Sequence, residues 1–173
     1  METRFSAIGG RGLRIFLFWV VVILVVVVDQ ATKAAAIEVL GDGSGVLIPG
    51  IMNLVHVENT GAAFSMGEGG GVLFIIIALA FLVGSCLLVW HENELPLGVV
   101  FSVGLVAGGG LGNMIDRIMN GSVTDFLSTA FINFPVFNFA DICVTVGVVC
   151  AIVGYWVWDS RRGEATASGE SHA

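Results

Sequence analysis

Carboxylate side chains at the ends of long apolar runs are the residues of this sequence that could do chemistry. Asp29 and Lys33 lie at the end of the first run, Asp116 follows the third, Asp125 lies between the third and the fourth, and Asp141 begins the fourth. Ionisable side chains are expensive to keep beside an apolar segment, so they are functional candidates by default. Four separate segments therefore supply acidic or basic groups.

Two such carboxylates held close together would form an acid–base pair. Because both cannot ionise cheaply at short range, the pair shares one proton. The ionised member then activates a water molecule, and the protonated member hydrogen-bonds the carbonyl under attack. This is aspartic peptidase chemistry and needs no cofactor. The sequence offers no Ser-His-Asp set, no metal-ligand cluster and no thiol outside the apolar runs.

The three candidate aspartates around the last two apolar runs differ in their surroundings. Asp125 has no Lys or Arg nearby in sequence and precedes Phe126, which favours a retained proton. Asp141 opens a predicted helix, whose free N–H groups favour the ionised form. Asp116 precedes Arg117, and an ion pair between them would make Asp116 a poor proton-sharing partner.

The composition indicates an integral membrane protein. The 173 residues are 56% hydrophobic and only 12% charged, against about 25% charged in a typical soluble domain. Such a surface excludes a soluble protein, and the hydrophobicity excludes intrinsic disorder. Seven Lys and Arg against fourteen Asp and Glu, a net charge of −7, exclude a basic face for nucleic acid. We expect one domain over residues 1–173.

Four apolar runs are long enough to cross a membrane, which takes about 20 residues. They are residues 13–36, 72–90, 97–115 and 139–158, with tails at 1–12 and 161–173. The expected fold class is therefore an all-α membrane protein with a small β element, because residues 51–57 are rich in β-branched side chains.

The basic residues predict the orientation of the spans. Three Arg residues precede the first span and two follow the fourth, whereas residues 37–71 contain no Lys or Arg. Positive residues stay on the cytoplasmic side, so both termini are expected there. The carboxylates then gather at the outer face of the membrane.

Small residues predict close packing of the third span. Gly104, Gly108 and Gly112 recur at four-residue spacing, which lets helix backbones approach one another in lipid. Cys86, Cys143 and Cys150 lie within apolar runs and are expected to be buried packing residues.

The first span has a second interpretation. Arg residues precede it and residues 34–36 are three Ala, so it also resembles a cleavable secretory signal. Cleavage would discard Asp29, Gln30 and Lys33, an unusual polar cluster for a disposable leader, so we favour a retained span.

The polar residues also have a purely structural interpretation, in which they cap helices. Asn138 would be an N-cap, Asp141 would interact with the helix N-terminus, and Asp116 would pair with Arg117. The gathering of the whole set at one depth favours a functional site, because interface anchors are usually Trp, Tyr, Lys and Arg.

Five ordered motifs carry a resemblance to a known family. They are Asp29-Gln-Ala-Thr-Lys33, Asn59-Thr-Gly-Ala-Ala-Phe-Ser65, Gly112-Asn-Met-Ile-Asp-Arg117, Val123-Thr-Asp-Phe126 and Phe134-Pro-Val-Phe-Asn-Phe-Ala-Asp141. Together they resemble the bacterial lipoprotein signal peptidases, or signal peptidase II, over residues 13–158.

The resemblance implies a hydrolase of the bacterial inner membrane that works at the outer, periplasmic face. Such an aspartic endopeptidase removes the signal peptide of a prolipoprotein by cutting just before a cysteine that carries diacylglycerol. Its partners would be lipid-modified prolipoproteins and membrane lipids, without cofactor or nucleic acid, and we expect a monomer.

The resemblance also assigns roles to residues. The catalytic pair would be Asp125 and Asp141. Residues that bind substrate or support the site would be Asp29, Lys33, Asn59, Gly61, Asn113, Asp116, Arg117, Asn138 and Ala140. The family fold would add an outer β-cradle, which residues 51–64 fit, and a loop helix over the site.

Two other function classes remain as alternatives. A small four-span proton-coupled exporter would need an isolated carboxylate in the middle of a span, and the second to fourth spans have none there. A non-enzymatic assembly factor, held together by the glycines of the third span, would leave the polar cluster unexplained.

Overall fold

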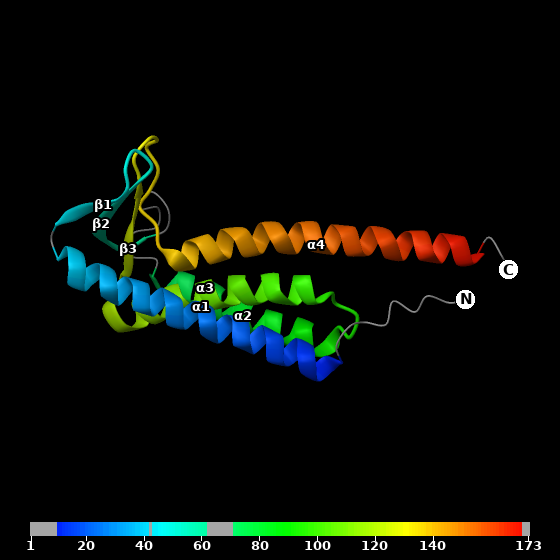
Figure 1. Cartoon of the computed structure of the whole chain (residues 1–173). Helices are drawn as coiled ribbons and strands as arrows, with labels where there is room; N and C mark the ends of the chain where they lie inside the picture. Colours follow the sequence, from blue (N-terminus) through cyan, green and yellow to red (C-terminus); the bar gives the residue numbers. More distant parts are fainter. Residues whose placement is uncertain (1–9, 42, 62–70, 171–173) are drawn as a thin grey trace.

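The computed structural model describes residues 10–41, 43–61 and 71–170, which form four long helices and a small sheet (Figure 1). The helices are α1 (Arg11–Leu40), α2 (Gly71–His91), α3 (Leu97–Asn120) and α4 (Phe139–Glu170). The strands are β1 (Ser44–Ile48), β2 (Met52–Asn59) and β3 (Val123–Thr129). The sheet lies at the end of the helix bundle opposite the start of α1 and the end of α4.

All four helices are long and apolar enough to cross a membrane, which confirms the predicted class. Their bounds differ from the prediction, because α1 begins at Arg11 rather than residue 13 and α3 ends at Asn120 rather than residue 115. Hydropathy marks where an apolar run ends, whereas a helix ends where its backbone turns away. In α3 that residue is Gly121, whose φ of 78° is left-handed and whose N–H donates to the carbonyl of Arg117.

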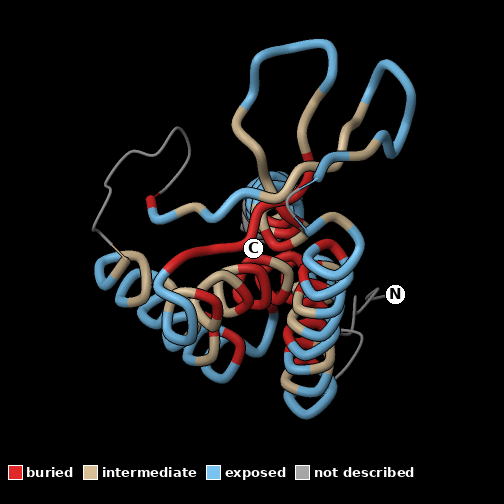
Figure 2. The backbone as a smooth tube through the Cα atoms, turned by 90° about the vertical axis from the view of Figure 1, so that its left-hand side faces the viewer, coloured by how far each residue is buried: buried red, intermediate tan, exposed pale blue. Residues whose placement is uncertain are grey.

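Large apolar side chains cover the outside of the bundle. Phe16, Ile76 and Trp156 are more than half exposed, and Figure 2 shows exposed residues along the outer faces of the helices and buried ones where the elements meet. An apolar surface of this extent requires lipid around it.

Cys150 belongs to this surface, so the expectation that it is buried was wrong, whereas Cys143 is buried.

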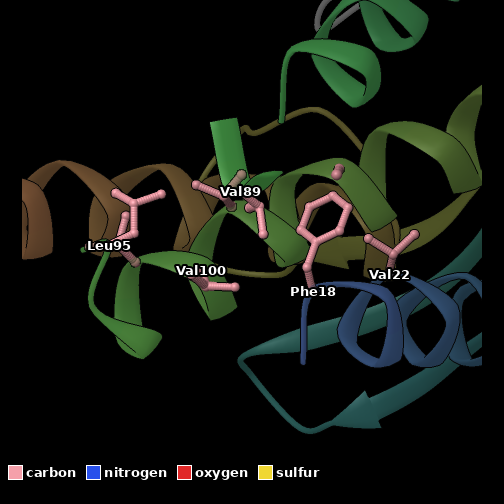
Figure 3. Close-up of a cluster of buried hydrophobic side chains, with 8 residues drawn as sticks. Phe18, Val22, Val89, Leu95 and Val100 are labelled. Atoms are coloured by element: carbon pink, nitrogen blue, oxygen red, sulfur yellow. The ribbon is translucent and has the colours of Figure 1, made fainter. Parts of the chain in front are cut away.

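The core forms around α3, which packs against each of the other helices. Figure 3 shows Phe18 and Val22 of α1 close to Val89 of α2 and to Val100 of α3. The predicted close packing at glycines is confirmed. A Cβ on Gly108 would lie 2.8 Å from the side chain of Val25, so only glycine allows α1 and α3 to approach this closely.

The sheet is antiparallel with the order β1-β2-β3. Strand β2 confirms the strand predicted at residues 51–57, although it extends to Asn59. Residues 62–64 of the predicted cradle lie outside the described residues. Within the described ranges α1 to α4 are the only α-helices, so the loop helix implied by the resemblance does not lie in them.

Candidate active site

The polar residues singled out in the sequence converge where the helix bundle meets the sheet. They come from five elements and from the residues beside them. Helix α1 contributes Asp29 and Lys33, β2 and the residues after it contribute Asn59 and Gly61, α3 contributes Asn113, Asp116 and Arg117, β3 contributes Asp125, and the start of α4 contributes Asn138, Ala140 and Asp141.

The start of α4 holds Asp141 in a reciprocal cap. The backbone N–H of Asn138 donates to Oδ2 of Asp141 at 3.1 Å, and the N–H of Asp141 donates to Oδ1 of Asn138 at 3.0 Å. This is a capping box with amide and carboxylate side chains. The structural interpretation of these two residues was therefore correct, and the same bonds fix the orientation of the Asp141 carboxylate.

Asn138 also connects the two candidate catalytic carboxylates. Its side-chain Nδ2 donates to Oδ1 of Asp125 at 2.8 Å, while its backbone N–H contacts Asp141. The second oxygen of Asp125 accepts from Nδ2 of Asn59 at 2.9 Å. Each oxygen of Asp125 thus has an amide donor, and one residue touches both carboxylates.

Burial shifts Asp125 towards its protonated form. Its side chain lies in the interior, with the residue 2% exposed. Removal from water raises the pKa of Asp125 to about 6, with a further increase from the charge of Asp141, against the hydrogen bond from Asn59. The direction agrees with the expectation from the sequence that Asp125 favours its protonated form.

Asn113 connects Asp141 to the charges on α1. Its Nδ2 donates to Oδ1 of Asp141 at 2.8 Å, and its Oδ1 accepts from the ammonium group of Lys33 at 2.9 Å. Because Lys33 can only donate, it forces the Asn113 amide to present its NH₂ group to Asp141. Lys33 also contacts the carboxylates of Asp29 at 2.8 Å and Asp116 at 2.7 Å.

The expected ion pair between Asp116 and Arg117 is not among the ion pairs of the described residues. Consecutive residues on a helix point about 100° apart, and Asp116 turns to Lys33 and to the Gln30 amide at 2.8 Å. Arg117 instead donates to the carbonyl oxygen of Gly61 at 3.0 Å, and its guanidinium lies 4.9 Å from the ring centre of Phe74.

A pocket of about 680 Å³ opens beside these groups. Its polar lining includes both candidate catalytic aspartates, Asn113 and Arg117, and most of its other lining residues are apolar. The apolar wall comes from α2, α3, α4 and the segment before α4, through Phe74, Ile77, Ala78, Phe81, Val106, Phe134, Pro135, Val136, Phe137, Ile142, Val144 and Val146. The site therefore suits a substrate with a polar backbone beside an apolar segment.

Three residues that hold the site together were not among the predicted site residues, although Gln30 was noted in the polar cluster of the first span. Gln30 binds Asp116, Thr124 donates its N–H to Asp116 at 3.4 Å and accepts from Asn138 at 3.5 Å, and Phe74 covers Arg117. Gln30 had a signal, since an amide beside Asp29 within an apolar run is costly. The other two become partners only through the fold.

The chemistry available is that of carboxylates and amides. Across residues 10–41, 43–61 and 71–170, no three His, Cys, Asp or Glu side chains lie close enough together to hold a metal ion. Nothing in this donor set calls for a cofactor.

Known proteins resemble the chain over most of its length. The family described as signal peptidase (SPase) II matches residues 21–157. A lipoprotein signal peptidase of Parasynechococcus marenigrum is 44% identical over 77% of this chain and 84% of the relative. Another, from Lactiplantibacillus plantarum, is 36% identical over 80% of this chain and 93% of the relative.

Solved structures agree with these matches. A bacterial membrane enzyme superposes with a TM-score of 0.75 at 30% identity, covering 83% of this chain and 90% of that one. A second bacterial membrane enzyme gives a TM-score of 0.71 at 32% identity, over 80% and 91% of the two chains. These matches do not support the exporter alternative.

Proposed function

The chain belongs to the signal peptidase II family, and we propose that it cleaves prolipoproteins with Asp125 and Asp141 as an aspartic dyad. Signal peptidase II enzymes are proteases that remove signal peptides from prolipoproteins, and this chain is a protease of that kind. The proposal concerns the residues that perform the reaction, the form of the substrate and the side of the membrane.

The observation that carries the dyad is the position of Asn138, which is hydrogen-bonded to both carboxylates beside the pocket. Asp125 keeps the proton and hydrogen-bonds the scissile carbonyl. Asp141 is ionised and takes a proton from the attacking water. The proton then passes to the leaving amide nitrogen as the tetrahedral intermediate collapses. No step requires a cofactor.

Arg117 is proposed to bind the substrate backbone. Its Nε is buried and has no hydrogen-bond partner in the described residues, while Nη2 is already bound to Gly61. Arg117 lines the pocket, so a movement of its guanidinium on substrate binding would let Nε donate to a substrate carbonyl, since an unpaired buried donor is costly. The aromatic ring of Phe74 holds the guanidinium in this position.

The apolar wall of the pocket supports a lipid-modified substrate. We propose that a diacylglyceryl-modified cysteine brings its acyl chains to this wall and that the bond before this cysteine is cut. Burial of acyl chains contributes about 0.8 kcal/mol per CH₂. The site then lies at the periplasmic face of the inner membrane, with both termini cytoplasmic, and a monomeric single domain suffices.

The test is a cleavage assay with the purified full-length protein. A prolipoprotein peptide is offered with and without the diacylglyceryl group, and the products are identified by mass spectrometry. We expect one cut, before the cysteine of the lipidated peptide, at the same rate with or without a chelator. Equal cleavage of the unlipidated peptide would contradict the lipid requirement, and loss of activity with a chelator that zinc restores would contradict the aspartic mechanism.

A further inference from the structure

We propose that Glu58 is a positioning residue, which locks the register of β2 against β3 so that Asn59 faces Asp125. The proposal rests on the dyad proposed above, because Asp125 is the group that Asn59 contacts. It concerns a residue on the opposite face of the sheet, away from the pocket, whose effect on the reaction would be transmitted through the strand pairing.

The two faces of the β2–β3 ladder carry different side chains. Val57 pairs with Asp125, Glu58 with Thr124, and Asn59 with Val123. Because side chains alternate along a strand, Asn59 shares one face with Asp125 and Val123, and these three line the pocket. Glu58 and Thr124 share the other face.

The register of this ladder is interrupted just before the site. The pairing shifts between Leu54 and Val57, so the last three pairs are offset from those before them. A slip of one residue would turn every side chain to the other face. Asn59 would then leave the pocket, and Oδ2 of Asp125 would lose its donor. The register of the three pairs after the irregularity therefore needs a contact that fixes it, independent of the earlier pairs.

Glu58 supplies that contact through hydrogen bonds to Ser122 and Thr124, on the β3 side of the ladder. Its carboxylate accepts from the hydroxyl of Ser122 and, at 3.3 Å, from the hydroxyl of Thr124, and it contacts Nε2 of His56 at 3.1 Å. Partial burial opposes ionisation of Glu58, but the hydrogen bonds from Ser122 and His56 outweigh it and lower the pKa of this carboxyl. Ser122 and Thr124 are buried, so their hydroxyl groups require these acceptors.

His56 extends the same cluster to α1. Its Nδ1 lies 3.1 Å from the carbonyl oxygen of Gly41, which follows α1, while its Nε2 faces Glu58. Thr124, in turn, immediately precedes Asp125 and is also bound by Asp116 and Asn138. Loss of the Glu58 carboxylate would thus remove the hydrogen-bond acceptor of the Thr124 hydroxyl, next to the proposed catalytic Asp125.

The test compares Glu58→Ala and Glu58→Gln with Glu38→Ala, an exposed Glu near the end of α1. We expect Glu58→Ala to lower kcat about tenfold, the factor typical of one lost hydrogen bond, with KM within about twofold. The limb of the pH–rate profile set by Asp125 should move to higher pH, because the donor that stabilises its ionised form is displaced. Glu58→Gln keeps an acceptor for Ser122 and should recover most of kcat.

A double variant checks the route of the effect. If Glu58 acts through Asn59, Glu58→Ala should add little to the loss in Asn59→Ala, whereas independent effects would multiply. Should Glu58→Ala fail to fold, Ser122→Ala and Thr124→Val remove the same bonds one at a time and should show the same displaced pH limb.

Two outcomes separate this proposal from the dyad. If Glu58→Ala has the kcat and pH profile of Glu38→Ala while Asp125→Asn is inactive, the positioning role is wrong and the dyad stands. If folded Asp125→Asn remains active, the dyad itself is wrong.

Discussion

Oδ1 of Asp29, in α1, accepts a hydrogen bond of 3.0 Å from the backbone N–H of Ala140, in the first turn of α4. Both residues are completely buried. The first N–H groups of a helix have no partner within the helix, and here a carboxylate from another helix provides one. Since Asp141 is the next residue, α1 fixes the position of one proposed catalytic group.

This contact predicts a graded effect of substitutions at Asp29. Asp29→Ala removes both the acceptor for Ala140 and the ion pair with Lys33, so we expect a loss of about 3–5 kcal/mol, typical of a broken buried pair, together with low activity. Asp29→Asn keeps an oxygen for Ala140 and should lose less. Thermal unfolding in detergent measures both variants, and an unchanged Tm for Asp29→Ala would contradict the role.

The close packing of Gly112, in α3, against Asp29, in α1, leads to a second prediction. A Cβ on Gly112 would lie 2.5 Å from Oδ2 of Asp29, so Gly112→Ala must displace a buried carboxylate that pairs with Lys33. We expect it to cost about 1–3 kcal/mol and to reduce cleavage. Gly98→Ala is the matched control on the same helix, because a Cβ there meets nothing within 4 Å. Equal Tm and activity for the two variants would show that the packing is not needed.

The sequence was sufficient for the parts of the fold that depend on local composition. The length of each apolar run predicted the four spans, and the cost of charges beside such runs marked Asp29, Lys33, Asp116 and Asp141 as candidates, which the structure brings together. The capping roles of Asn138 and Asp141 were also predictable, since a capping box is formed within four residues.

The features that the sequence predicted wrongly or did not indicate depend on contacts between segments distant in sequence. Asp116 was expected to pair with its neighbour Arg117, but the side chain that reaches it is Lys33 of another helix. Strand β3 has only a short sequence signal, and its register depends on β2. The capping of α4 by Asp29 joins residues 111 positions apart, and no local pattern indicates it.

The raised pKa of Asp125 predicts the pH dependence of cleavage. A shared proton is needed, and it is lost as the pH rises through the pKa of about 6, so kcat/KM of the free enzyme should fall above that pH. The hydrogen bond from Asn59 lowers this pKa, so Asn59→Ala should move the fall to higher pH. A shift to lower pH in Asn59→Ala would contradict the assignment to Asp125.

The same proton predicts how stability varies with pH. The folded protein binds it more tightly than the unfolded chain, in which the carboxyl titrates near 3.8. Its contribution to the free energy of unfolding is therefore fully present below that pH and is lost as the pH rises through about 6. Asp125→Asn should remove this component from the pH dependence of Tm, which thermal unfolding in detergent across this range would measure.

The dyad predicts different consequences for the three aspartates near α3 and α4. Asp125→Asn and Asp141→Asn keep the size of the side chain but cannot share or accept a proton, so each should lower kcat by about 10³-fold or more. Both variants should stay folded and still bind the lipidated peptide, because the pocket wall is unchanged. Binding and turnover are measured separately, by peptide retention and by product formation.

Asp116→Asn serves as the contrasting variant in this series. It leaves Lys33 with one carboxylate instead of two, so we expect a lower Tm and a partial loss of activity, because Lys33 also orients Asn113 toward Asp141. A structural role lowers the amount of active enzyme, whereas a catalytic role lowers the rate of each folded molecule. If folded Asp116→Asn were inactive while Asp125→Asn cleaved at nearly the wild-type rate, Asp116 and not Asp125 would be the partner of Asp141.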